Sequence, residues 1–168
     1  MTATYERIAT YTVTGSTTSI VTFSSISGAY TDLVIIANVR KSGENGEAMF
    51  VTFNGDNNSN YSYTWISGNG SSLASYRATN DLRIQVYNQT ITAGTFTVNI
   101  LNIPNYSNTT TFKTLIGRAG TDNLRVNAVA GLWRSTSAIN SITLTPDFYL
   151  SPSWQIGSTF NIYGIKAE

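Results

Sequence analysis

The chain contains no histidine and no cysteine, and only 11% of its 168 residues are charged. The missing thiols exclude disulfides and cysteine nucleophiles. The missing imidazoles exclude histidine-dependent triads and zinc sites built from the usual His and Cys ligands. An ordinary domain carries about a quarter charged residues. We therefore expect a surface of hydroxyl and amide groups, which suits a protein held in an assembly or one that faces an uncharged polar ligand such as a sugar.

The charges that are present are balanced, with ten Lys and Arg against nine Asp and Glu spread along the chain. Binding to nucleic acid needs a clustered basic stripe. The sequence has no such cluster, so we expect no nucleic-acid partner. Residues 8–31 carry no charge, but Thr and Ser interrupt every apolar run, so no membrane helix is expected there. The residues after Met1 alternate between polar and apolar, so we also expect no targeting segment.

Thr, Ser and Asn are abundant and together account for 61 residues. Apolar residues recur at every second position, and the types involved (Thr, Val, Ile, Tyr and Phe) favour β-strands. The sequence predicts strands at 6–14, 19–23, 33–40, 48–54, 61–66, 81–87, 95–101, 110–118, 125–133, 141–145 and 159–166.

The alternation is plainest at 49–53, 82–86 and 96–100, where every second residue is apolar and is expected to share one face. Residues Leu33–Ile36 form a continuous apolar run, which favours a strand covered on both faces. Residues 72–78 could form a short helical turn. Residues 124–134 also fit helical spacing, but alternation favours a strand there.

Asn-Gly pairs at Asn45, Asn54 and Asn69 separate the predicted strands and supply the positive φ angles of tight hairpins. About eight to eleven short strands with frequent turns predict an all-β fold, a two-sheet antiparallel sandwich of the jelly-roll type. We expect one domain over residues 1–168, because a chain of this length builds one core.

The candidate sites are weak. Asp56–Asn60 spaces oxygen ligands like the start of a calcium loop, but it lacks the Gly and the Glu that such a loop needs, so a polar hairpin loop is favoured. Nine acidic residues are scattered, mostly in turns. We expect no catalytic residue, no cofactor and no metal.

Aromatic and arginine residues are the remaining partner candidates. Tyr61, Tyr63 and Trp65 share one face of a predicted strand, where core packing is favoured over a sugar-stacking platform. The residues expected to bind a partner are Tyr5, Arg77, Arg83, Arg118 and Arg134.

Several segments together carry a resemblance to a known family. These segments are Gly131–Ser135, Ile139–Leu144, Gly157–Ile165, Tyr30–Ile35, Val51–Asp56 and Asn60–Ser62. In order along the chain they resemble the structural proteins of tailed-bacteriophage virions of the jelly-roll type. This resemblance implies a β-sandwich on the outside of a phage particle, either a capsid decoration (cement) protein or the tip of a fibre.

The length of the chain favours decoration over a fibre tip, because a fibre protein usually carries a shaft or attachment domain before its tip. The expected role is then mechanical. The protein would be made in the host cytoplasm, bind the major capsid protein on the outer surface of the virion, and stabilise the shell as a trimer or dimer.

Residues 1–6 are a candidate docking arm. Recognition of a host surface glycan, or its cleavage by a carboxylate pair, are the alternatives.

Overall fold

The computed structural model describes residues 4–42, 49–86, 95–121, 125–146 and 152–166, which form β-strands and no helix. None of these residues belongs to a helix that could cross a membrane. The strands are β1 (Tyr5–Thr12), β2 (Val21–Phe23), β3 (Asp32–Val39), β4 (Phe50–Phe53), β5 (Tyr61–Gly68), β6 (Leu73–Asp81), β7 (Ile84–Gln85), β8 (Thr97–Pro104), β9 (Lys113–Thr121), β10 (Val126–Trp133), β11 (Ile142–Thr145) and β12 (Thr159–Ile165).

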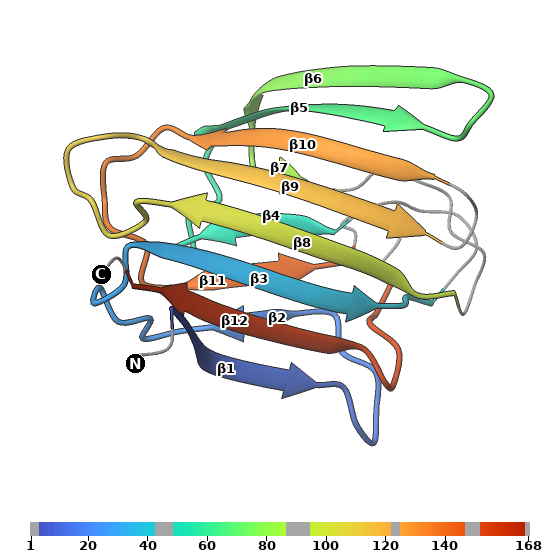
Figure 1. Cartoon of the computed structure of the whole chain (residues 1–168), viewed down its shortest axis with the longest axis horizontal. Coiled ribbons are helices and arrows are strands. Elements are labelled where there is room, and N and C mark those ends of the chain that lie inside the picture. Colours follow the sequence, from blue (N-terminus) through green and yellow to red (C-terminus); the bar gives the residue numbers. More distant parts are fainter. Residues whose placement is uncertain (1–3, 43–48, 87–94, 122–124, 147–151, 167–168) are drawn as a thin grey trace.

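The strands form two antiparallel sheets that lie face to face (Figure 1). The larger sheet has eight strands in the order β1-β12-β3-β8-β9-β10-β5-β6, and the smaller has four in the order β2-β11-β4-β7. Every pairing between neighbouring strands is antiparallel. The predicted all-β, two-sheet antiparallel sandwich is confirmed.

The strand order is that of a jelly roll extended by two hairpins. Without β5, β6, β9 and β10, the sheets read β1-β12-β3-β8 and β2-β11-β4-β7. Strands from the two ends of the chain then pair successively, β1 with β12 and β2 with β11, as in one long hairpin folded over into two sheets. The hairpins β5–β6 and β9–β10 continue the first sheet beyond β8, where Figure 1 shows them stacked above it.

The core lies between the sheets and is filled from the inward positions of both. Met49, Val51 and Phe53 are buried on one face, as the alternation predicts. Leu33, Val34 and Ile35 are buried on consecutive positions, whereas Ile36 at the end of the predicted run is half-buried. The Trp133 ring lies 5.6 Å from Phe53 and stacks at 6.3 Å on Tyr61.

The aromatic residues of β5 belong to this core. Tyr61, Tyr63 and Trp65 are at most 9% exposed, so the predicted core packing is confirmed. The residues between them face the other side of the sheet.

Residues 72–78 do not form a helical turn, and residues 73–78 lie in β6, so the helical alternative was wrong. The Asn69 side-chain oxygen accepts hydrogen bonds from the amides of Ser71 and Ser72. This tight turn directs the chain back along β5. Residues 126–133 form β10, so the strand preferred there over a helix is confirmed.

Of the predicted strand at 81–87, residue 87 lies outside the described residues, Asp81 ends β6, and only Ile84 and Gln85 form a strand of their own, β7. The Asp81 carboxylate accepts the amide hydrogens of Leu82 and Arg83 at 2.7 and 3.3 Å. That local turn withdraws both amides from strand pairing.

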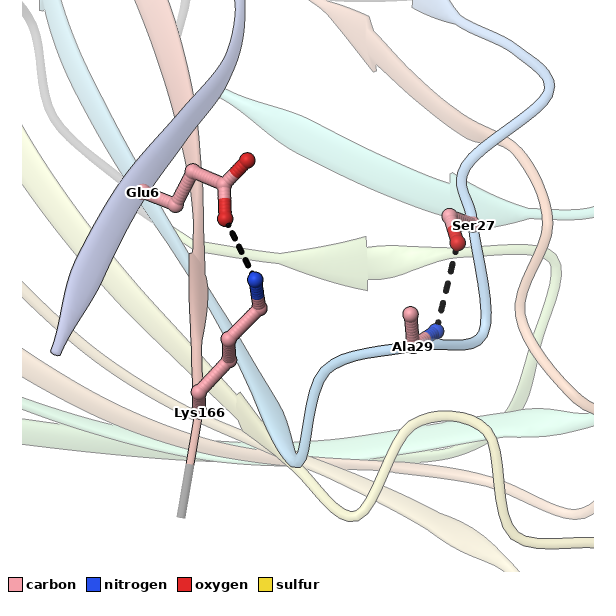
Figure 2. A network of polar contacts seen from close by, with 4 residues as sticks. All are labelled: Glu6, Ser27, Ala29 and Lys166. Carbon is pink, nitrogen blue, oxygen red and sulfur yellow. Dashed lines mark hydrogen bonds and ion pairs between the residues drawn. The ribbon is translucent and has the colours of Figure 1, made fainter. Parts of the chain in front are cut away.

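The N-terminal segment is part of the large sheet from Tyr5 onward. Residues 1–3 of the proposed arm lie outside the described residues, whereas Tyr5 and Glu6 belong to β1 and pair with β12. Glu6 accepts an ion-paired hydrogen bond from Lys166 at 2.8 Å (Figure 2). Lys166 holds the pKa of Glu6 below its ordinary value.

A small turn places Tyr30 against β12. The Ala29 amide donates to the Ser27 hydroxyl at 3.3 Å (Figure 2), and the Tyr30 ring that follows covers Gly164 on its inward side. A Cβ at Gly164 would overlap that ring, whereas a Cβ at Gly120 in β9 would meet nothing.

We expect Gly164→Ala to lower the free energy of unfolding by about 1–3 kcal/mol, because overpacking forces side chains and backbone to shift. Gly120→Ala is the matched control and should be neutral or slightly stabilising, since Gly weakens a strand interior. Urea unfolding of both variants measures the difference. Equal effects at the two positions would contradict the packing of Tyr30 on Gly164.

The connection between β4 and β5 is held by Asp56. One carboxylate oxygen accepts from the backbone and side-chain N–H of Asn58 at 2.9 and 2.8 Å. The other accepts from Asn60 Nδ2 at 2.9 Å and Trp133 Nε1 at 2.7 Å. The predicted polar loop is confirmed, and its carboxylate ties the loop to β10. Burial raises the pKa of Asp56, but these four hydrogen bonds outweigh it and lower the pKa to about 2.

We expect Asp56→Asn to lower the free energy of unfolding at pH 7 by about 2 kcal/mol, because an amide cannot accept all four hydrogen bonds. The folded-state pKa of Asp56 lies below the unfolded value of about 3.9. Its stabilisation is therefore complete above pH 4 and is lost as the pH falls toward 2. Urea unfolding at several pH values should show the two proteins converging in acid. A stability gap that does not change with pH would contradict this role.

Candidate binding surfaces

Of the five residues expected to contact a partner, three lie on one side of the large sheet, whereas Arg83 and Arg134 lie elsewhere. Tyr5 is 58% exposed on the edge strand β1. Arg118 in β9 and Arg77 in β6 are exposed on the side of the large sheet that points away from the small sheet. We call this side the outer face. Tyr5 also points to the outer face, because it lies directly opposite Ile165 of β12, which points to that side.

Arg134 is a structural residue at the end of β10. Its guanidinium donates to the Ser59 carbonyl at 2.8 Å and to the Asn80 side-chain oxygen at 3.0 Å. These bonds fasten the β4–β5 connection to the end of β6. Arg134 is therefore engaged within the chain and is set apart from the other candidates.

The outer face carries a group of exposed aliphatic side chains that the sequence pattern alone did not single out. Their exposed fractions run from 47% to 90%. They are Ile66, Leu73, Val98, Ile116 and Val126. Isolated exposed aliphatics are normal, but a contiguous group marks an interaction surface.

Strand register places three of these side chains, Val98, Val126 and Leu73, in line across the sheet. One row across the sheet runs Val98, Gly120, Val126, Gly68 and Leu73, from β8 through β9, β10 and β5 to β6. We call it the aliphatic row. The space over Gly120, on one side of Val126, is open, whereas the Leu73 side chain reaches over Gly68 on the other side.

The alternation of polar and apolar residues is reversed at this end of the sheet. Val98 is 47% exposed while its neighbour Asn99 is 1% exposed. Val126 and Asn127 repeat this arrangement in β10, and Ile66 and Ser67 repeat it in β5. A sheet with one solvated face normally presents its polar residues to water. The reversal occurs on three strands at the same place, so it is a property of the sheet and not of one residue.

Polar atoms are correspondingly buried on the inner side. Asn99, Ala119, Asn127 and Ser67 are neighbours across four strands. The Asn99 side-chain oxygen and both polar atoms of the Asn127 side chain find no hydrogen-bond partner among the described residues, and the Thr97 hydroxyl does not either. Such orphaned atoms cost about 1–3 kcal/mol each. The inner side of the sheet thus carries polar groups at the same place where the outer face carries aliphatic ones.

A groove of about 580 Å³ runs beside the aliphatic row. Ile66, Leu73, Val126 and Ala128 contribute its apolar walls. Leu73 packs close over Gly68, where an added Cβ would lie 3.2 Å from one of the Leu73 methyl groups.

A second groove, of about 740 Å³, crosses the outward side of the small sheet. Thr52 and Thr143 form its hydroxyl floor, with Asn57, Ile20 and Arg83 around it. The Arg83 guanidinium lies 4.6 Å above the Phe50 ring, which fixes its plane. Of the predicted residues, only Arg83 borders this groove.

The sequence did not identify Tyr76 as a candidate contact residue, because residues 72–78 were not predicted to form a strand. It is 51% exposed and stacks on Trp65 at 5.7 Å. Gln85 accepts hydrogen bonds from the Tyr63 hydroxyl and the Trp65 ring N–H at 3.1 and 3.3 Å. Burial, with the Asp81 carboxylate nearby, raises the pKa of Tyr63 well above its ordinary value. Tyr63, Trp65 and Tyr76 form a strip of aromatic side chains that ends at the exposed Tyr76. We call it the aromatic strip.

No protein-family model matches the chain, and no curated protein matches it. A structure comparison finds a crystal structure of a protein of unknown function from Shewanella oneidensis MR-1, which shares 8% sequence identity at a TM-score of 0.23. The match covers 86% of this chain and 62% of that one. The chain thus spans less than two thirds of that protein's length.

Proposed function

We propose that this chain is a non-enzymatic structural protein of a tailed-phage virion, which binds the major capsid protein and stabilises the shell from its outer surface. The resemblance to virion proteins suggests the class. The observation that carries the proposal is the reversed alternation on the outer face. Aliphatic side chains that would ordinarily be buried are exposed there as a group.

The energetics of this face favour a partner that covers it. Removing a Val, Leu or Ile side chain from water contributes about 1.5–3 kcal/mol. The aliphatic row offers several such side chains on one rigid sheet. Association consumes part of that gain, but the remainder is realised only in the assembled shell, so binding favours assembly by mass action. Arg77 and Arg118 lie on the same face and can donate to carbonyl or carboxylate groups of the partner.

The acidic residues in the described segments support a structural role. Asp56 accepts three hydrogen bonds within its loop and one from Trp133 in β10. Asp81 accepts two backbone amides, Asp32 accepts the Asn105 amide, and Glu6 is paired with Lys166. Each carboxylate therefore has an evident part in shaping a turn or a strand end.

Purified chain should bind expanded capsids at stoichiometric copy number and raise their melting temperature. Val126→Asp should weaken that binding by at least about tenfold, because it places an unpaired charge in the contact. Ile20→Asp is the matched control, since Ile20 is an exposed aliphatic on the small sheet, and it should bind normally. Co-sedimentation and capsid calorimetry measure both effects. Failure of the parent chain to bind any shell would refute the proposal.

A second candidate function is recognition of a host surface glycan, and the groove on the small sheet favours it. Its hydroxyl floor, the Asn57 amide and the oriented Arg83 can hydrogen-bond sugar hydroxyls, and Ile20 can contact an apolar sugar face.

If a glycan binds there, a glycan array should give a defined signal that Asn57→Ala and Thr143→Val reduce by about tenfold or more, since each removes a hydrogen-bonding group. Val126→Asp on the other sheet should leave the signal unchanged. A signal that resists both groove substitutions would contradict this site, and the same three variants separate glycan binding from capsid binding.

A further inference from the structure

Strand β6 is the free edge of the large sheet on the side away from β1. It is the outermost strand in Figure 1, and among the described residues it pairs with β5 alone. It contains no proline, and Ala78 is its single fully buried side chain. Its remaining side chains are exposed on both faces, apart from half-buried Asp81 at the end. Such an edge presents unpaired N–H and C=O groups to any approaching strand.

The hydrogen bonds at its ends show which residues present those groups. Asn69 N–H donates to the Ser72 carbonyl at 3.2 Å, which makes this pair a hydrogen-bonded one. Hydrogen-bonded pairs alternate along an antiparallel ladder. Ala74, Tyr76 and Ala78 therefore bond to β5.

The opposite side of β5 agrees with this assignment. Arg134 N–H donates to the Asn60 carbonyl at 2.8 Å, which directs the even-numbered residues of β5 to β10 and the odd-numbered ones to β6. The outward backbone groups of β6 then belong to Leu73, Ser75, Arg77 and Thr79.

The other edge of the sheet is built differently. β1 has a bulge between Arg7 and Ala9, and Glu6 is ion-paired with Lys166 beside it. Bulges and charges are the usual devices that prevent strand addition. β6 runs regularly over residues 73–79, and its one irregularity lies at Asn80, where φ is positive.

We infer that β6 is a self-association edge, where two copies of this chain pair antiparallel about a two-fold axis at Tyr76 and join their large sheets into one. This contact is distinct from capsid docking and does not rest on it. The backbone chemistry of the edge calls for a β-strand as partner, and the side chains of β6 fit a second β6.

Charge and strand length select the register. Centring the pair on Arg77 would set two guanidinium groups opposite each other, which is destabilising. Centring it on Ser75 would leave Thr79 opposite the turn residue Ser71. Centring it on Tyr76 pairs all four outward residues, with Arg77 opposite Ser75 and Leu73 opposite Thr79.

The same register extends the aromatic strip. Tyr76 already stacks on Trp65 and shows its other side to solvent, with 51% of its surface exposed. Across the axis it meets Tyr76 of the second copy, which gives a continuous run of aromatic side chains from one molecule to the other. Aromatic cross-strand pairs of this kind stabilise antiparallel sheets.

Cysteine scanning tests the register directly, because the chain has no cysteine of its own. Tyr76→Cys would face itself at a Cα separation of about 4.5 Å, within disulfide range. Mild oxidation should cross-link it roughly tenfold or more faster than Thr10→Cys on the β1 edge. Ser75→Cys would cross-link fastest if the pair were centred on Ser75, and Arg77→Cys if it were centred on Arg77. Fastest cross-linking at Ser75 or Arg77, or rates at Tyr76 no higher than at Thr10, would overturn the inference.

A proline variant tests the interface without a cysteine or an oxidation step. The unsubstituted chain should run as a dimer by light scattering at tens of micromolar. Ser75→Pro removes an outward N–H that β5 does not use, so the monomer should keep its circular dichroism while the dimer is lost. Thr10→Pro on the β1 edge should leave the dimer intact. A monomeric parent chain, or a dimer unaffected by Ser75→Pro, would refute β6 pairing. Neither measurement involves capsids, so failure here is separable from failure of the decoration proposal.

Discussion

The antiparallel register that joins β8, β9, β10 and β5 determines what both faces of the large sheet carry. Because side chains alternate, a one-residue slip would exchange the two faces. The observed register sends Val98 and Val126 outward and Asn99 and Asn127 inward. It exposes apolar surface and buries amide atoms that have no hydrogen-bond partner among the described residues. A protein that covers the outer face would remove the first of these costs, the exposed apolar surface, which is why the proposed function rests on this register.

The two inserted hairpins supply most of this unusual surface. Eight jelly-roll strands form the sandwich proper, and β5–β6 and β9–β10 extend only one of its sheets. Four of the five exposed aliphatics on the outer face, all but Val98, lie on these added strands. The sheet extension ends in β6, where both faces and the edge are accessible. The jelly roll thus provides a rigid platform, and the hairpins provide the surfaces available for partners.

Polar side chains in the turns mainly stabilise the fold. Asp56, Asn69 and Asp81 each use a side-chain oxygen to accept backbone amides at a strand boundary. Arg134 does the reverse and donates to a carbonyl across a loop. These contacts explain why residues that are chemically attractive as sites are engaged within the chain. The residues left facing solvent on the sheets are hydroxyls, aliphatics and a few arginines.

The sequence by itself determined most of the strands and the two-sheet sandwich, because period-two alternation and Asn-Gly turns are local properties. It also identified Tyr61, Tyr63 and Trp65 as core residues. It did not reveal β6, because the alternation there is weak and the strand exists through pairing with β5. It did not show that Val98 and Val126 face outward, or that Arg134 is a structural clamp. Those outcomes depend on which strands pair, in which register, and on which face the second sheet covers, and only tertiary structure decides these non-local relations.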